Sequence, residues 1–262
     1  MKSISGSREE TLSGRGMGRF ARPGKRLRQH LARVLLSALI VLLVPALIFD
    51  NEVFGMTKKK HVVLLGASVG HDWKIDSLPE RLGQNSGANR YSFEFVGDYQ
   101  FDKTQTLRKI LQRRKNRPDA ILLKECAAYF PGDLNRYQEL MKGWIKECRN
   151  AGVIPVPTTV VPVIRQQSLM SRIKDTVKFL LGRPTSGMQL ERITQYNDWI
   201  RSYAASEKLA VLDLEEAVRR SAADRSLRTD LHSGDGLHLN AGAYRLLDPI
   251  VVPVLDQAFK RK

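Results

Sequence analysis

The sequence has few of the residues that build disulfide scaffolds and metal sites. It contains two cysteines, Cys126 and Cys148, and five histidines among 262 residues. Cys126 is expected at the end of a strand and Cys148 near the end of the helix that runs back from it, so we expect no disulfide between them. The histidines are scattered without the spacing of metal ligands, and we expect neither a metal nor another cofactor.

Acidic residues are also scarce, with 27 Asp and Glu against 43 Lys and Arg and a formal net charge of +16. Part of this excess lies in residues 1–30, a Gly-, Ser- and Arg-rich stretch that we interpret as a basic, disordered cytoplasmic tail. The chain lacks a glycine-rich phosphate loop and a motif of interleaved basic and aromatic residues. We therefore predict no nucleic-acid partner.

Charge is absent from one long run, residues 34–49. With Leu31, Ala32 and a snorkelling Arg33, residues 31–49 are long enough for a transmembrane anchor, followed by a linker at 50–60. Basic residues are more frequent before this run than after it, which predicts a cytoplasmic N terminus and a domain on the periplasmic or exterior side. The alternative is a cleaved signal peptide and a secreted domain, with cleavage near Val53-Phe54-Gly55.

After the linker, short apolar runs alternate with helical patterns, which predicts a domain at 61–262 built from βαβ units. We expect strands at His61–Leu65, Tyr91–Val96, Ala120–Lys124, Val153–Pro157 and Ala210–Leu214. We expect helices at Ser77–Gln84, Thr104–Lys115, Leu134–Asn150, Met188–Ser206, Glu215–Ala222 and Ala241–Phe259. Right-handed crossovers then give a three-layer α/β/α sandwich around a five-stranded parallel sheet.

The first of these strands ends in Gly66-Ala67-Ser68-Val69-Gly70. Ser68 is therefore expected in the turn at the carboxyl end of the strand, the edge of an open α/β sheet where ligands bind. The flanking glycines allow a sharp turn and a close approach of substrate. This pattern is compatible with a nucleophilic serine, and equally with a turn that has no catalytic role.

A second block near the end of the sequence favours the catalytic interpretation. Asp235 and His238 lie three residues apart, just before the last predicted helix. A serine hydroxyl becomes a useful nucleophile when a histidine takes its proton and a carboxylate orients that histidine. We therefore predict a catalytic triad of Ser68, His238 and Asp235.

A serine block on the first strand and an Asp-x-x-His block at the end resemble the SGNH/GDSL hydrolase superfamily. The resemblance spans residues 61–259 and implies a flavodoxin-like sandwich and ester substrates. It also implies oxyanion donors at the backbone N–H groups of Ser68 and Gly97. The superfamily has an asparagine donor after the third strand, where this chain has none; Lys124 or a backbone N–H of residues 126–128 is the candidate in its place.

The sequence thus predicts a membrane-anchored serine esterase acting on an ester-bearing small molecule, glycan or lipid of the cell envelope. His71 and Lys124 are candidate substrate contacts. The alternatives are an O-acyltransferase of the same fold and a binding or scaffolding domain with weak or no turnover. A basic amphipathic pattern at residues 163–187 predicts a helix that covers the site, lies on a membrane or packs on the core.

Overall fold

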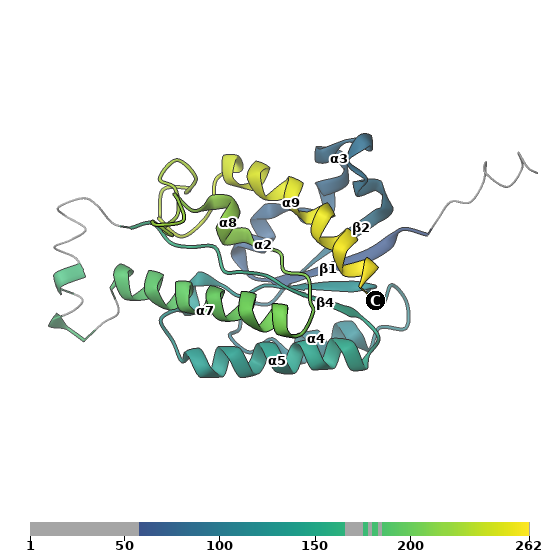
Figure 1. Cartoon of the computed structure of the whole chain (residues 1–262), viewed down its shortest axis with the longest axis horizontal. Coiled ribbons are helices and arrows are strands. Elements are labelled where there is room, and N and C mark those ends of the chain that lie inside the picture. Colours follow the sequence, from purple (N-terminus) through teal and green to yellow (C-terminus); the bar gives the residue numbers. More distant parts are fainter. Residues whose placement is uncertain (1–57, 166–174, 178–179, 183–184, 262) are drawn as a thin grey trace, which may run out of the picture. The chain divides into compact units, whose positions relative to one another are not determined.

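The computed structural model describes part of the chain (Figure 1). The described residues are 58–165, 175–177, 180–182 and 185–261. They belong to one compact unit, Thr57–Lys262. The predicted tail and membrane anchor, and the linker up to residue 57, lie outside them. Within the described ranges, none of the helices has the length and apolar character needed to span a bilayer.

A parallel sheet of four strands forms the centre of this unit, in the order β2-β1-β3-β4. The strands are β1 (Lys60–Gly66), β2 (Tyr91–Gly97), β3 (Ala120–Leu123) and β4 (Ile154–Pro157). β1 pairs with β2 and β3, so that Val62 lies opposite both Phe93 and Ala120. The run Val62–Leu65 is at most 1% exposed, which explains its continuous apolar sequence. The predicted α/β class and parallel sheet are confirmed.

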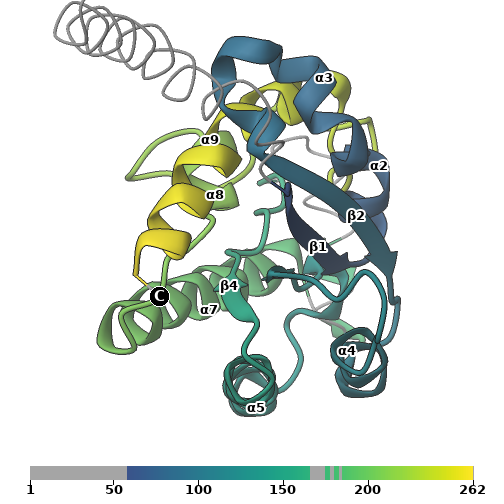
Figure 2. The same cartoon turned by 90° about the vertical axis from the view of Figure 1, so that its right-hand side faces the viewer.

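Helices cover both faces of the sheet (Figures 1 and 2). The helices are α2 (Ser68–Trp73), α3 (Leu78–Leu82), α4 (Thr104–Leu111), α5 (Leu134–Asn150), α7 (Ser186–Ser206), α8 (Leu214–Val218) and α9 (Ala241–Lys260). Short 3-10 turns lie at Ile75–Ser77, Gln84–Ser86, Ala88–Arg90 and Ala127–Tyr129. α5 has the predicted bounds, and α9 begins at the predicted residue because the Asn240 side chain accepts a hydrogen bond from the Ala243 N–H.

Side chains alternate between two cores along each strand. Val62 and Leu64 of β1 point into the core shared with α2, α3, α8 and α9, whereas Val63 and Leu65 point into the core shared with α4, α5 and α7. This alternation follows from the two-residue period of a strand. The described residues therefore form three layers, helix, sheet and helix.

The prediction of a fifth strand at Ala210–Leu214 is wrong. Only Leu212 pairs there, in a single parallel bridge with Thr158. The next residue, Asp213, turns its side chain to the N–H of Glu216 and caps α8, so Leu214 already belongs to the helix. Helix capping thus ends the pairing after one bridge.

Three predicted helices are longer than the observed ones. α3 ends at Leu82 because Gly83 adopts a φ of 73°, and α4 ends at Leu111 ahead of a loop in which Asn116 has a φ of 54°. α8 ends at Val218, where Arg219 is extended. Left-handed and extended residues cannot continue a right-handed helix.

A buried carboxylate on α9 joins three helices. Asp248 is 4% exposed and accepts a hydrogen bond from the indole N–H of Trp73, at the end of α2 (2.8 Å). Arg81 of α3 donates to both of its oxygens (2.7 and 2.8 Å). This three-way contact fixes α2, which begins at Ser68, against α9, which begins just after His238.

We expect Asp248→Ala to lower the free energy of unfolding by about 3 kcal/mol, because it leaves a buried indole N–H and a partly buried guanidinium without their partner. Urea unfolding of a fragment starting at residue 57 measures this. Glu139→Gln is the matched control, since Glu139 is exposed and forms only a surface ion pair with the half-buried Lys142. Equal stability of the Asp248→Ala and Glu139→Gln variants would contradict the proposed importance of the contact.

Candidate active site

Ser68 lies where the chain leaves β1 and enters α2. The sequence predicted a turn here, whereas the structure begins a helix at Ser68 itself, with Ala67 as the cap residue. Gly70 allows this helix to lie close to the sheet: a Cβ at this position would be 2.8 Å from the ring of Phe95. The second glycine of the Gly-x-Ser-x-Gly block is thus explained by packing.

Asp235 and His238 lie in a tight loop before α9. The loop is closed by a bridge between His232 and Leu239, and the Asn240 side chain donates to the carbonyl of Asp230 (2.7 Å). Gly236 has a φ of 78°, and a Cβ on it would be 2.7 Å from the Ile164 side chain. Glycine is therefore required between the two predicted catalytic residues.

These two segments, at opposite ends of the described unit, meet in a chain of hydrogen bonds. His238 Nε2 lies 2.9 Å from Ser68 Oγ, and His238 Nδ1 lies 2.5 Å from Asp235 Oδ2. Ser68 is half-buried, while the side chains of His238 and Asp235 are 32% and 48% exposed. The arrangement can pass the serine proton to the imidazole, with the carboxylate orienting the ring, and it is open to solvent.

The second oxygen of Asp235 is held by the backbone. The N–H groups of Leu237 and His238 donate to Oδ1 over 2.9 and 2.8 Å. Burial opposes ionisation of this carboxyl, but the hydrogen bonds from the His238 ring and from these N–H groups outweigh it and hold the pKa of Asp235 well below its usual range. The carboxylate therefore stays ionised beside His238.

Gly97, the predicted second oxyanion donor, ends β2 at the same edge. It is in register with Gly66, and the following residue, Asp98, donates its backbone N–H to the Gly66 carbonyl (2.8 Å). The Asp98 carboxylate in turn accepts hydrogen bonds from the Gln100 N–H and the Thr106 hydroxyl. The end of β2 is thus tied firmly to the end of β1.

Lys124 is placed away from solvent. It is 2% exposed, and its ammonium group donates to the backbone carbonyl of Glu125 (3.0 Å). Burial lowers the pKa of Lys124. The structure therefore does not bring this candidate substrate contact to the surface around Ser68.

A buried ion pair beneath this edge was not found from the sequence. Lys103 is 1% exposed and donates to Glu125 (3.0 Å) and to the carbonyl of Gln100 (3.0 Å), while its ammonium group lies 4.7 Å from the centre of the Tyr129 ring. Burial raises the pKa of Glu125, although Lys103 acts in the opposite direction. The pair connects the loop after Gly97 to the end of β3, two segments whose contact no sequence spacing indicates.

His71, the other predicted substrate contact, lies near this edge. His71 is one helical turn after Ser68, is exposed, and pairs with Asp72 (3.1 Å). Cys126 and Cys148 are both buried and free. Among the described residues, no group of three or more His, Cys, Asp or Glu side chains is arranged to hold a metal ion.

The predicted helix at 163–187 falls largely outside the described residues. Among its described apolar positions, Val163 is 4% exposed, whereas Val177, Leu180 and Leu181 are 49%, 77% and 65% exposed. These three side chains do not pack on the core.

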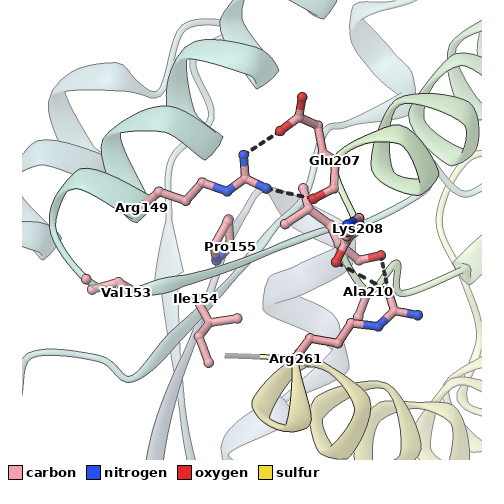
Figure 3. Close-up of a pocket in the computed structure, with 11 residues that line it drawn as sticks. Arg149, Val153, Ile154, Pro155, Glu207, Lys208, Ala210 and Arg261 are labelled. Carbon is pink, nitrogen blue, oxygen red and sulfur yellow. Dashed lines mark hydrogen bonds and ion pairs between the residues drawn. The ribbon is translucent and has the colours of Figure 1, made fainter.

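One cavity lies far from the serine. It has a volume of about 290 Å³ and is found where β4 begins and α9 ends (Figure 3). Arg149, Glu207, Lys208 and Arg261 stand around it, with no serine, cysteine or histidine. It offers none of the chemistry of the Ser68 site.

No family model and no curated protein matches the sequence. Solved structures match the fold. A candidate acylhydrolase from Bacteroides fragilis has a TM-score of 0.53 and 15% identity over 78% of this chain and 88% of its own. A GDSL-like lipase from Bacteroides thetaiotaomicron has a TM-score of 0.52 and 14% identity over 82% and 95%. An acetyl xylan esterase has a TM-score of 0.51 and 16% identity over 72% and 97%.

These similarities show that the described domain has a fold found in acylhydrolases and esterases. More particularly, the chain has the fold of the SGNH/GDSL hydrolases, and the resemblance found in its first and last sequence blocks is confirmed at the level of the fold.

We expect the carboxyl of Asp235 to titrate below the range of ordinary aspartates, and the midpoint to rise in His238→Ala, because the variant removes the ring hydrogen bond that favours the ionised form. Carbon-detected NMR of the carboxyl groups measures both midpoints. Asp230 is the internal control, since its pKa is lowered by Arg228 and does not depend on His238. An Asp235 midpoint that is unchanged in the variant would contradict this account.

Proposed function

We propose that the protein is a membrane-anchored serine esterase or acylhydrolase in which Ser68, His238 and Asp235 form the catalytic triad. The observation that carries the proposal is the unbroken series of hydrogen bonds from Asp235 through His238 to Ser68. It lies at the carboxyl edge of the sheet, on a fold shared with lipases and esterases. A protein that only needs the fold as a scaffold has no use for this arrangement of three residues.

In the proposed mechanism, His238 Nε2 takes the proton of Ser68 as the hydroxyl oxygen attacks the carbonyl carbon of an ester. Asp235 stabilises the imidazolium that forms. The tetrahedral intermediate collapses when His238 donates the proton to the leaving alcohol, and an acyl-serine remains. Water, deprotonated by the same histidine, then attacks the acyl-serine and releases the carboxylic acid and the free serine.

The negative oxygen of the intermediate needs hydrogen-bond donors. The N–H of Ser68 is available because the first N–H groups of a helix have no partner within it, and Gly97 supplies the second donor. The ammonium group of Lys124 donates its hydrogen bond to the backbone carbonyl of Glu125. We therefore assign the third donor to the start of the 3-10 turn Ala127–Tyr129, whose first N–H groups likewise lack a partner within the turn.

The proposed substrates are acyl esters of envelope carbohydrates or lipids. This follows from the predicted anchor at 31–49, which would place the domain on the periplasmic or exterior side of the membrane. The open, solvent-exposed triad suits a bulky ester-bearing molecule.

Ser68→Ala is expected to lower kcat/KM for short-chain nitrophenyl esters by at least about 10⁴-fold, because removing a triad nucleophile costs at least this much in other serine hydrolases. A fluorophosphonate probe should label Ser68 in the parent chain and fail to label the variant. Ser77→Ala changes a serine outside the site, and this variant should retain both ester hydrolysis and labelling by the probe. Hydrolysis that survives in Ser68→Ala would exclude the mechanism.

Two other candidate functions give different results in the same assay. An O-acyltransferase of this fold would label with the probe and form an acylated product only when a sugar acceptor is added. A binding domain would neither label nor turn over ester, with or without an acceptor. The binding domain is a candidate because this chain has no asparagine donor after the third strand.

A further inference from the structure

The edge of the sheet opposite Ser68 is strongly basic. In a parallel sheet all strands begin at one edge, and the segments that lead into the strands lie together there. The exposed cations of these segments and of the end of α9 are Lys58, Lys59, Lys60, Arg90, Arg114, Lys115, Arg117, Arg149, Lys208, Lys260 and Arg261. We call this set the amino-edge face.

Contacts join these segments into one surface. The Lys60 ammonium group lies 5.6 Å from the centre of the Phe259 ring at the end of α9. Arg261 donates to the carbonyls of Lys208 and Leu209, and Arg149 donates to the carboxylate and carbonyl of Glu207 (Figure 3). The cavity described above is a hollow within this face.

Acidic residues neutralise only part of this charge. Glu207 pairs with Arg149 and Asp256 pairs with Arg90, while Asp76 and Glu80 lie around the same surface hollow as Lys59. Three neighbouring cations, Arg114, Lys115 and Arg117, form an exposed loop before β3, and none has a carboxylate partner among the described residues. Such a loop attracts a polyanionic surface.

The edge that carries Ser68 holds exposed charges of both signs. Its acidic residues include Asp72 in α2, Asp98, Asp102, Asp133 and Asp235, and its exposed cations include Lys74, Arg136 and Arg165. In the described domain, positive charge therefore predominates at the amino-edge face and is mixed with acidic residues at the other edge, which favours one orientation in the field of an anionic surface.

The described chain begins at the amino-edge face, with Lys58. In the sequence, eight residues separate Lys58 from the end of the uncharged run 34–49. We propose that the amino-edge face contacts the anionic headgroups of the phospholipid bilayer in which the chain is anchored. The inference extends the proposed anchoring and does not depend on ester hydrolysis.

The proposal has a consequence for substrate. β1 spans seven residues between the face and the turn before Ser68, which is about 20 Å at 3.3 Å per residue. With the face on the bilayer, the triad is directed away from the lipid surface. The favoured substrates are then acylated glycans or soluble esters rather than the acyl chains of the anchoring membrane.

The test uses the full chain in nanodiscs of phosphatidylcholine alone or of an equal mixture with phosphatidylglycerol. We expect amide hydrogen exchange of residues 112–119 to slow severalfold in the anionic discs only, since each basic residue near an anionic surface raises the affinity for it by about fivefold and the bound loop is shielded from solvent. High salt should remove the effect by screening. Exchange in residues 229–239, around Asp235 and His238, should not change.

Two charge-reversal variants separate a local contact from an effect of net charge. Arg114→Glu with Lys115→Glu and Arg117→Glu should abolish the protection. Arg136→Glu with Arg192→Glu and Arg245→Glu, exposed positions on α5, α7 and α9, changes the charge equally and should retain it. Equal loss in both variants, or equal protection in both kinds of disc, would overturn the proposal.

Two further outcomes also have a definite meaning. Protection of residues 112–119 by a DNA duplex at physiological salt, with none from anionic lipid, would overturn the proposal in favour of nucleic acid. Loss of the chain from the discs would refute the anchor. Exchange of residues 112–119 is then compared with neutral and with anionic vesicles added, and equal exchange in the two would overturn the lipid contact. Ester hydrolysis is measured on every variant, so a failure of the proposed enzyme activity is seen separately.

Discussion

The parallel pairing of β1 with both of its neighbours is the constraint on which the other features depend. β1 is buried on both faces and hydrogen-bonded on both sides, to β2 and β3. Parallel strands share their direction, so all their carboxyl ends lie at one edge and all their amino ends at the other. Ser68 and Gly97 therefore meet at one edge, and the basic segments that lead into the strands meet at the opposite edge.

The triad also requires the two ends of the domain to be held together. Ser68 begins a helix of six residues, too short to be stable alone, and the close contact of Gly70 with the sheet and the bond from Trp73 to Asp248 hold it. Asp248 belongs to the helix that follows His238. One buried carboxylate thus links the nucleophile segment to the histidine segment, 170 residues apart.

Local patterns predicted much of this arrangement. The apolar run predicted β1 to within one residue at each end, and the predicted bounds of α5 are the observed ones, with Asp133 capping the helix directly before its first residue. Ser68, Asp235 and His238 were selected because each belongs to a short motif. The fifth strand failed because its apolar run resembles a strand, while the capping of α8 by Asp213 ends the pairing after one residue.

Contacts between distant residues could not be predicted in the same way. Lys124 was expected beside the substrate from its place after β3, but burial turned its ammonium group to a backbone carbonyl. The ion pair of Lys103 with Glu125 and the bonds of Arg81 and Trp73 to Asp248 have no sequence signal, because their partners come together only when the layers pack.

The sequence by itself determined the class of fold, the places of four strands along the chain and the three residues proposed for catalysis, because apolar periodicity and short motifs are local properties of the chain. Only the tertiary structure decided the distances between Ser68, His238 and Asp235, the burial of Lys124 and the gathering of basic loops at one edge. Those properties depend on how the elements pack, and packing joins residues that no spacing along the chain relates.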